Sequence, residues 1–278
     1  MQLIIISGLS GSGKSVALKV LEDGGFYCID NLPTPFLPQI AGYLQEDGHD
    51  KIAISIDVRG GPSLDAIPQQ LDSLKAQGVD VRLLFLEAKT ETLVKRFSET
   101  RRRHPLAISS LTVTEAIGLE REMLAGIGDL GHRIDSSDLN ANTLRNWVKT
   151  VVEMDQSRLT LIVESFGFKH GIPLDADLVF DVRSLPNPHY VPDLKPLTGR
   201  DEPVIDFLQA QPEVREMYQD IEHFVARWLP SFVKDNRSYL TIAVGCTGGQ
   251  HRSVYFAEQL GKRFSEEQQV IVRHRELS

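Results

Sequence analysis

One stretch of the sequence carries residue types and a spacing suited to binding a triphosphate. Residues 8–15 read Gly-Leu-Ser-Gly-Ser-Gly-Lys-Ser and match the pattern G-x-x-x-x-G-K-[ST] in full. Its glycines let several backbone N–H groups converge on phosphate oxygens, Lys14 would reach the β- and γ-phosphates, and the Ser15 hydroxyl would bind Mg²⁺. The predicted nucleotide site is therefore Gly8, Leu9, Ser10, Gly11, Ser12, Gly13, Lys14 and Ser15.

A carboxylate and an arginine follow another apolar stretch of the sequence. Asp57 ends the run 52–57, as a Walker B carboxylate does, and would hold Mg²⁺ or its water opposite Ser15. The alternative is an aspartate that caps a loop turn. Lys14 and Asp57 are thus the predicted catalytic residues, Ser15 and Asp57 the predicted metal ligands, and no residue is predicted to orient water. Arg59 is either a phosphate contact or half of a surface ion pair.

A basic cluster, Arg101-Arg102-Arg103-His104, ends a predicted helix over residues 90–103. Positive side chains at this position complement the negative carboxyl end of the helix dipole. Alternatively, they form a lid over bound phosphates, as in P-loop folds that resemble nucleoside-monophosphate kinases. The sequence leaves both interpretations open.

A second glycine loop, residues 245–253, also lies between an apolar strand and a helix. Its small residues permit a backbone nest for an oxyanion, and Arg252 adds a charged fork. Cys246 and Arg252 also satisfy C-x5-R, the loop of cysteine-dependent phosphatases, for which Asp193 could serve as general acid. However, Gly245 stands where those enzymes usually have a histidine. A non-catalytic phosphate site is therefore preferred over a phosphatase or a structural turn with a buried cysteine.

Further polar and basic groups fall on predicted loops in the second half of the chain. Together with Arg252 they could form one phosphate- or RNA-binding patch, although each alone is typical of an ordinary surface. These groups are Lys169-His170, Asn187-Pro188-His189 and Asn236-Arg237-Ser238.

Apolar runs and helical periodicity alternate along the chain, which predicts an α/β fold with a parallel sheet covered on both faces. The predicted strands of the first half are 3–6, 26–30, 52–57, 81–86 and 132–136, and its helices are 16–22, 36–44, 63–77, 90–103, 114–124 and 141–154. This series is complete near residue 155, so the predicted domains are 1–155 and 156–278. The second is smaller, with strands at 159–164, 176–182, 239–244 and 269–273 and helices at 204–208, 213–229 and 253–264.

The composition is that of a globular protein, with 41% hydrophobic and 24% charged residues among 278. No apolar run approaches the roughly 20 residues that span a bilayer, and the apolar start of the chain, interrupted at Gly8, is expected to be a strand and not a signal peptide. Two cysteines form no disulfide framework, so a cytoplasmic location without membrane contact is expected. The net charge of −8, with neither half basic, requires any RNA contact to come from a local patch.

Several motifs together resemble the RapZ/YvcJ family over essentially the whole chain. They are residues 8–15, 25–33, 55–59, 164–171, 185–189 and 245–253. The resemblance implies an N-terminal P-loop NTPase domain with a kinase-like fold and a C-terminal α/β domain similar to a phosphofructokinase subdomain. It also implies weak ATPase and GTPase activity, with ATP at residues 8–15 and a GTP-linked site at Asp57, Val58, Arg59 and Gly60.

In the enterobacterial members the resemblance further implies an RNase adapter. Such a protein binds small regulatory RNAs through its C-terminal domain and delivers one of them to RNase E, which controls glucosamine-6-phosphate synthase. A homo-tetramer and an amino-sugar phosphate ligand are also implied. The RNA- or phosphate-binding residues carried over by motif are Lys169, His170, His189, Arg237, Thr247, Gly248, Gly249, Arg252 and Ser253.

Two departures from the enterobacterial pattern reduce positive charge on the proposed RNA side. Those relatives end in a short basic tail, whereas this sequence ends Arg-His-Arg-Glu-Leu-Ser, and Gln250 replaces a lysine. Weaker RNA affinity or a different RNA is therefore expected. The leading hypothesis is a nucleotide-switched RNA-binding protein, and the rivals are a P-loop small-molecule kinase and a Cys246-dependent phosphatase.

Overall fold

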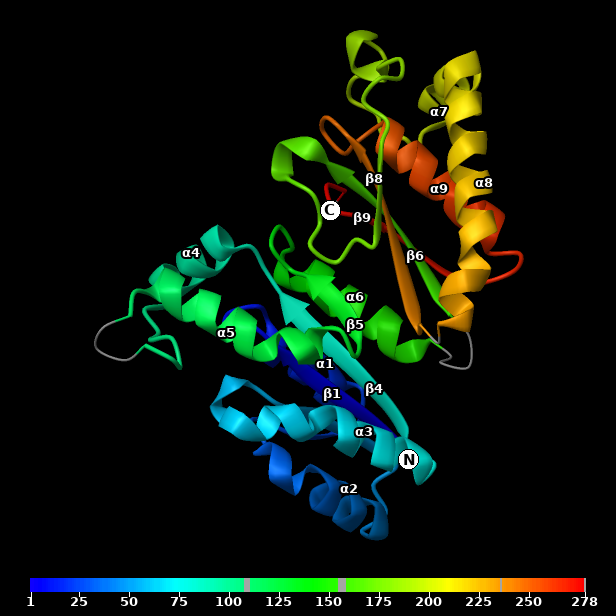
Figure 1. The fold of residues 1–278 in the computed structure, drawn as a ribbon. Helices are drawn as coiled ribbons and strands as arrows, with labels where there is room; N and C mark the ends of the chain where they lie inside the picture. Colours follow the sequence, from blue (N-terminus) through cyan, green and yellow to red (C-terminus); the bar gives the residue numbers. More distant parts are fainter. Residues whose placement is uncertain (108–110, 155–158, 236, 278) are drawn as a thin grey trace. The chain divides into compact units, whose positions relative to one another are not determined.

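The computed structural model describes residues 1–107, 111–154, 159–235 and 237–277, with only the backbone described at 61–63. The chain divides into two compact units, Met1–Val152 and Glu153–Ser278 (Figure 1). Each unit is built on one β-sheet, of five strands in the first and four in the second. The predicted domain boundary at residues 155 and 156 lies outside the described residues.

The sheet of the first unit has the strand order β2-β3-β1-β4-β5, and all neighbouring strands are parallel. Alternate residues of a strand point to opposite faces of a sheet. Leu3 and Ile5 of the central strand join the main core, while Ile4 and Ile6 are equally buried on the other face. The strands are β1 (Gln2–Gly8), β2 (Tyr27–Ile29), β3 (Lys51–Ser55), β4 (Asp80–Glu87) and β5 (His132–Asp135).

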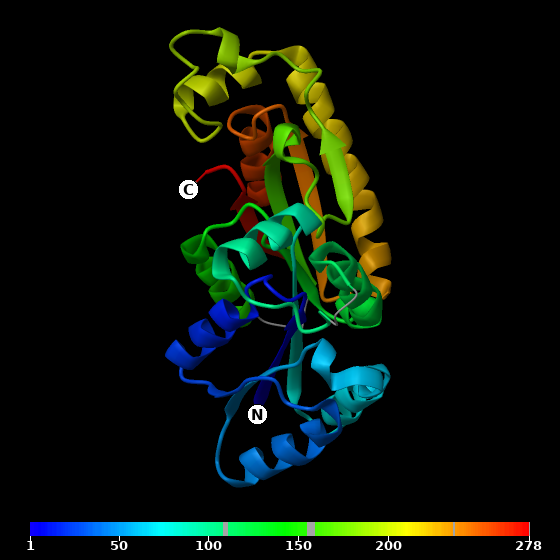
Figure 2. The same cartoon turned by 90° about the vertical axis from the view of Figure 1, so that its left-hand side faces the viewer.

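Helices pack around this sheet, as Figures 1 and 2 show. The core of the first unit joins side chains of α2, α3 and α5 to one face of the sheet. The helices are α1 (Lys14–Asp23), α2 (Leu37–Glu46), α3 (Ile67–Ala76), α4 (Thr90–Thr100), α5 (Val113–Gly128) and α6 (Ala141–Glu153), with the 3₁₀ segments η1 (Thr34–Phe36) and η2 (Val58–Ala66).

Two of the predicted helices are shorter in the structure by three residues or more. The helix predicted over 63–77 is α-helical only from Ile67, because Pro68 fits a first helical turn and η2 precedes it. The helix predicted over 90–103 ends at Thr100, because Arg101 takes a left-handed conformation with φ of 52°. The basic cluster therefore follows α4 and does not form its last turn.

The second unit has the strand order β7-β8-β6-β9, again with all neighbouring strands parallel. Side chains of α8 and α9 share one core with the sheet, and both helices lie along it in Figures 1 and 2. The elements are β6 (Thr160–Gly167), η3 (Phe168–His170), β7 (Leu178–Asp181), η4 (Pro188–Tyr190), α7 (Glu202–Gln209), α8 (Pro212–Lys234), β8 (Tyr239–Cys246), α9 (Arg252–Phe264) and β9 (Gln269–His274). The predicted fold class, a parallel-sheet domain followed by a smaller α/β domain, is confirmed.

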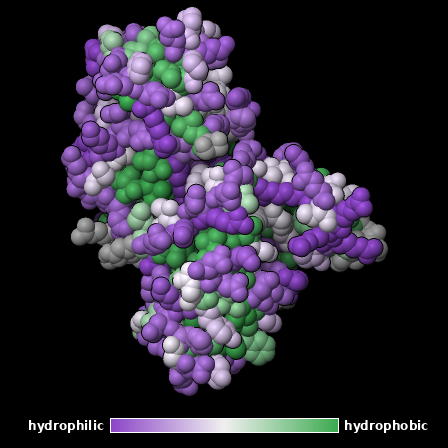
Figure 3. All heavy atoms as spheres, turned by 180° about the vertical axis from the view of Figure 1, so that it is seen from behind, coloured by the Kyte–Doolittle hydropathy of each residue, from purple (hydrophilic) through white to green (hydrophobic). Residues whose placement is uncertain are grey.

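The surface agrees with the polar composition. The face of the chain in Figure 3 is mostly hydrophilic, with smaller hydrophobic areas between the polar side chains. Within the described part of the chain, every helix is too short or too polar to cross a membrane.

An ion-pair network at Glu258 ties α9 to β9 in the second unit. The Glu258 carboxylate lies 3.0 Å from His274 Nε2 and accepts from Arg200 Nε at 2.6 Å. The hydrogen bond with His274 and the pairing with Arg200 outweigh partial burial and lower the pKa of Glu258 from 4.5 to about 2. A carboxyl with a depressed folded pKa stabilises the fold above its unfolded pKa and loses this contribution as the pH falls.

We expect Glu258→Gln to remove part of the acid sensitivity of the second unit. In the wild type, the free energy of unfolding should fall between pH 4.5 and pH 2 as Glu258 takes up its proton. The variant should show a shallower fall over this window, measured by urea denaturation at several pH values. The exposed Glu266→Gln serves as control. A Glu258→Gln profile parallel to that of the wild type would contradict the assignment.

Candidate functional site

The first glycine loop follows β1, the central strand of its sheet, and its backbone admits only glycine at two positions. Gly8 has φ of 131°, and a Cβ there would lie 1.9 Å from the Leu86 carbonyl oxygen of β4. Gly13 has φ of 108°, and its Cβ would lie 2.6 Å from a methyl carbon of Leu144. Gly8 and Gly13 are therefore required both by conformation and by close packing, whereas Gly11, with φ of 85°, is favoured by conformation alone.

The start of α1 is open to an anion. Gly13 is the N-cap residue of this helix, and none of the described side chains caps it. The first N–H groups of an uncapped helix attract negative charge. The Lys14 amine lies over the loop and donates to the carbonyl oxygens of Gly8 at 2.6 Å and Leu9 at 3.1 Å. Burial lowers the pKa of Lys14, while the carboxylates of Glu120 and Asp57 oppose this shift.

Side chains of α4, α5 and the segment after β5 hold the glycine loop in place. Glu120 of α5 is fully buried and accepts from the Ser10 N–H at 2.8 Å and from the Ser10 hydroxyl at 2.7 Å. The Ser136 hydroxyl lies 2.7 Å from the Ser12 carbonyl oxygen, and Arg96 donates to the Gly11 carbonyl oxygen at 3.0 Å. These contacts fix the loop to α4, α5 and the segment after β5.

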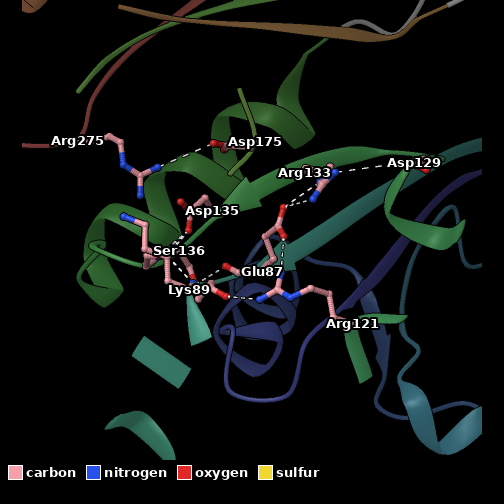
Figure 4. A network of polar contacts seen from close by, with 11 residues as sticks. Glu87, Lys89, Arg121, Asp129, Arg133, Asp135, Ser136, Asp175 and Arg275 are labelled. Carbon is pink, nitrogen blue, oxygen red and sulfur yellow. Dashed lines mark hydrogen bonds and ion pairs between the residues drawn. The ribbon is translucent and has the colours of Figure 1, made fainter. Parts of the chain in front are cut away.

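The strand ends behind the loop are joined by a network of charges. Figure 4 shows Glu87, the last residue of β4, between the guanidinium groups of Arg121 and Arg133. Glu87 accepts from Arg133 Nε at 2.8 Å and from Arg121 Nη1 at 3.1 Å. Burial raises the pKa of Glu87, and the two arginines oppose that shift. The network ties α5 and β5 to the end of β4, where Ser136 also reaches the glycine loop.

The basic cluster is anchored to the same buried carboxylate as the loop. His104 Nε2 lies 3.0 Å from a Glu120 carboxylate oxygen, and both side chains are fully buried. His104 Nδ1 accepts the Leu106 N–H at 3.1 Å, so Nε2 carries the ring proton and donates it to Glu120. One carboxylate therefore holds both Ser10 of the loop and the segment that carries Arg102 and Arg103.

Asp57 lies beyond the end of β3, the neighbour of β1, and is bound by Arg59. Asp57 is the N-cap of η2 and accepts the Arg59 N–H at 2.9 Å. Arg59 Nε also donates to both Asp57 carboxylate oxygens, at 3.0 and 2.9 Å. Burial works against ionisation, but these bonds outweigh it and lower the pKa of Asp57. Both alternatives considered for these residues, a turn cap and an ion pair, are therefore present in the structure.

One cavity of about 440 Å³ collects these groups in the first unit. Seven of the predicted nucleotide-site residues line it, namely Ser10, Gly11, Gly13, Lys14, Ser15, Asp57 and Arg59. Gly8, Leu9, Ser12, Val58 and Gly60 are not among its lining residues. Arg102 and Arg103 also line the cavity, as the lid interpretation expects, and so does Asp30, which the sequence analysis did not identify.

In the second unit, three loops meet at the carboxyl edge of the parallel sheet. The Lys169 N–H, after β6, donates to the Thr247 carbonyl oxygen, after β8, at 3.3 Å. Arg252 Nη1 donates to the carbonyl oxygens of Arg183 and Leu185, after β7, at 2.8 Å each. The structure thus brings the second glycine loop together with two of the predicted loops of the second half, those after β6 and β7.

The polar groups at this edge differ in exposure. Thr247, Lys169, His170 and His189 are exposed, and Gly248 is half-buried. Arg252 is 3% exposed, and its buried Nε has no hydrogen-bond partner among the described residues. Burial lowers the pKa of Arg252. The arginine therefore stabilises the loops at this edge through Nη1 and Nη2.

Arg237 does not join this edge. It precedes β8 and so lies at the opposite, amino edge of the sheet from the glycine loop that follows the strand. Its guanidinium donates to Asp177 at 2.7 Å. Its neighbour in the predicted patch, Asn236, lies outside the described residues. The predicted grouping of Arg237 with Arg252 is therefore corrected.

Cys246 and Ser253 are internal to the second glycine loop. The Cys246 thiol is 3% exposed, lies in the core of the second unit and accepts the Gly249 N–H at 3.2 Å. The Ser253 hydroxyl is fully buried and lies 3.1 Å from the sulfur. Such burial favours the structural interpretation of Cys246 over a nucleophile that substrates can reach.

Known proteins resemble the chain over its full length. A model of the RapZ-like N-terminal domain matches residues 1–156, and a model of the RapZ C-terminal domain matches residues 159–278. A protein of Chromobacterium violaceum named nucleotide-binding protein is 64% identical, covering 100% of this chain and 99% of its own. A protein of the same name from Thiobacillus denitrificans is 60% identical, covering 100% of both chains.

Among solved structures, the tunicamycin resistance protein of Deinococcus radiodurans is 14% identical with a TM-score of 0.42. It covers 55% of this chain and 96% of its own, and at this level the likeness carries no functional argument. The two domain models and the full-length relatives do identify the protein's family. The chain belongs to the RapZ family, with a RapZ-like N-terminal domain followed by a RapZ C-terminal domain.

Proposed function

We propose that the N-terminal unit binds ATP or GTP together with Mg²⁺ and hydrolyses the nucleotide slowly. The observation that carries this proposal is that Lys14, Ser15, Asp57 and two arginines of the basic cluster line one cavity. The names of the close relatives, which are called nucleotide-binding proteins, support it. The cavity combines an open helix start with fixed positive charges, the combination that suits a triphosphate.

The residues of the cavity fit a metal ion carried by the nucleotide. Mg²⁺ prefers hard oxygen ligands and usually combines one or two protein oxygens with substrate phosphates. Ser15 and Asp57 would hold it, and the Asp57 carboxylate would exchange hydrogen bonds from Arg59 for the ion. The described residues contain no cluster of three His, Cys, Asp or Glu that could hold a metal by itself, which agrees with such a shared site. The ion would supply positive charge against the phosphates.

Hydrolysis would rest on positioning and electrostatics. The Lys14 amine would exchange the carbonyl oxygens of Gly8 and Leu9 for phosphate oxygens. Arg102 and Arg103, held beside the loop by the buried His104–Glu120 contact, would oppose the charge that develops on the transferred group. The arrangement predicts slow turnover, because none of the predicted catalytic residues activates water.

For the C-terminal unit we propose a phosphate-binding edge that takes RNA. The exposed Lys169, His170 and His189 and the half-buried Gly248 lie on the loops that follow β6, β7 and β8, and the family membership supports this role. The protein would act as an RNase adapter that presents a small regulatory RNA to RNase E and so controls glucosamine-6-phosphate synthase. An amino-sugar phosphate would compete for the same edge, a homo-tetramer would be the active assembly, and nucleotide binding would be the regulatory input.

We expect a Lys169→Ala, His170→Ala double variant to separate the two functions. RNA bound in cells is identified by crosslinking and sequencing, and its affinity is then measured at several salt concentrations. The variant should bind this RNA about 10-fold more weakly and with a smaller salt dependence, because phosphate contacts are lost. Its ATP affinity should equal that of the wild type.

Lys262→Ala, an exposed lysine of α9, is the matched control and should retain full RNA binding. Equal RNA binding by the double variant and the wild type would refute the assigned edge. Failure of the wild type to bind ATP or GTP would refute the nucleotide proposal independently.

A further inference from the structure

The cavity of the first unit extends beyond the residues that a nucleotide needs. Asp30 directly follows β2 and lines the cavity together with Lys14 and Asp57. Since β2, β3 and β1 are adjacent parallel strands, Asp30 and Asp57 extend from neighbouring strand ends at the carboxyl edge of the sheet. The charge of Asp30 acts on both the Lys14 amine and the Arg59 guanidinium.

The two carboxylates of the cavity are in different states. Both oxygens of Asp57 accept hydrogen bonds from Arg59, which lower the pKa of Asp57 despite burial and make it a poor base. Asp30 is exposed and makes no hydrogen bond or ion pair with any residue that the structure describes. Asp30 is therefore the carboxylate of this cavity that is available to accept a proton.

The cavity also holds arginine side chains in addition to Lys14. Lys14, the start of α1 and a nucleotide-borne Mg²⁺ already face the phosphates. Arg59, Arg102 and Arg103 line the same cavity in addition. Guanidinium groups bind carboxylates and phosphates through paired N–H donors. Besides opposing charge on the transferred group, these arginines therefore suit a second, smaller anion next to the nucleotide.

We propose that this cavity transfers the γ-phosphoryl group of ATP to the hydroxyl of a small anionic acceptor, with Asp30 as the proton acceptor. The proposal rests on the nucleotide binding proposed above. The acceptor is a hydroxyl compound that carries a carboxylate or phosphate, held by Arg59 and the basic cluster. Slow hydrolysis of ATP is then the reaction that occurs when water takes the place of the acceptor.

The step is a balanced phosphoryl transfer. The acceptor oxygen forms a bond to the γ-phosphorus while the bond from that phosphorus to the bridging oxygen breaks, and ADP keeps the electron pair. The hydroxyl proton passes to the Asp30 carboxylate and then to solvent. The products are ADP and the phosphate ester of the acceptor. Proton acceptance by a positioned carboxylate contributes about 10²- to 10⁴-fold to the rate of such reactions.

The test follows the γ-phosphoryl group. ATP labelled with ³²P in the γ-position is incubated with the full chain, Mg²⁺ and an ATP-depleted, protein-free small-molecule extract of bacterial cells. We expect label in an organic phosphate ester, separated from inorganic phosphate by chromatography. Asp30→Asn should reduce formation of this ester at least about 100-fold. Its affinity for ATP, measured directly, should stay within about twofold of the wild type.

Asp23→Asn, an exposed aspartate at the end of α1 and outside the cavity lining, is the matched control and should transfer like the wild type. Label that appears only in inorganic phosphate would overturn the acceptor site. Ester formation by Asp30→Asn at the wild-type rate would overturn the role of Asp30. Failure of the nucleotide proposal would look different, because the wild type would then bind no ATP at all.

Discussion

Replacing Lys14 with alanine is expected to lower the rate of ATP turnover by about 10²- to 10³-fold, the usual effect of losing one preorganised charge at a reacting phosphate. Lys14 lines the cavity, and its amine lies over the loop and donates hydrogen bonds to the carbonyl oxygens of Gly8 and Leu9. Alanine cannot supply the positive charge that opposes the developing negative charge on the transferred group. The measurement is ADP release in a coupled assay with purified protein.

A matched variant on the same helix separates charge at the site from charge in general. Lys19→Ala removes an exposed lysine of α1 that does not line the cavity, and its turnover should equal that of the wild type. The Lys14 variant should still fold, because the change removes a buried amine and leaves the loop glycines intact. Turnover by Lys14→Ala within threefold of the wild type would rule out the assigned role.

Replacing Gly8 with alanine is expected to reduce the free energy of unfolding of the first unit by about 3 kcal/mol or more. The new Cβ would lie 1.9 Å from the Leu86 carbonyl oxygen, a backbone atom of the neighbouring strand that cannot turn away. The φ of 131° adds backbone strain for any residue with a side chain. Urea denaturation monitored by circular dichroism measures the loss.

Gly25→Ala isolates the contribution of backbone strain alone. Gly25 has φ of 82°, but no atom lies within 4 Å of the position of its Cβ. We expect a loss of about 1–2 kcal/mol there, the cost of a left-handed conformation without a clash. Losses of equal size in the two variants would show that the close approach of β1 and β4 at Gly8 does not determine the stability of the loop.

The first glycine loop could be predicted from the sequence because its conformational requirements are local, although the close contacts of Gly8 with Leu86 and of Gly13 with Leu144 are not. Conformation at Gly8 and Gly13, the reach of Lys14 and the start of α1 all depend on residues within one strand-loop-helix segment. The strands were predictable for a similar reason, since a parallel sheet with both faces covered needs continuous apolar runs such as Leu3–Ile6.

The residues that support the loop could not be predicted because their contacts join distant parts of the chain. Glu120 binds Ser10 across 110 positions, and Ser136 approaches Ser12 across 124. No sequence pattern around a glutamate or serine in a helix or loop predicts such a distant hydrogen-bond partner. His104 belonged to a motif that the sequence showed, but its burial against Glu120 depends on the packing of α5.

The two interpretations of the basic cluster also required tertiary structure. Helix geometry alone favours arginines that complement the end of α4. In the structure the helix ends at Thr100, and Arg102 and Arg103 line the cavity of the first glycine loop. The same limit affected Arg237, whose basic character suggested a patch but whose position before β8 places it at the other edge of the sheet.

The sequence by itself determined the family, the α/β class and the presence of a P-loop motif, because each of these is recognised from residue spacing or from sequence motifs alone. The tertiary structure decided which charges share a cavity, which of them are free to react, and which serve the fold. Asp57 and Asp30 illustrate the difference, because both follow a strand. Only the structure shows that Asp57 accepts hydrogen bonds from Arg59, and that Asp30 lines the cavity without a hydrogen-bond partner among the described residues. Charge and proton transfer depend on distances between side chains, and these distances are properties of the folded chain.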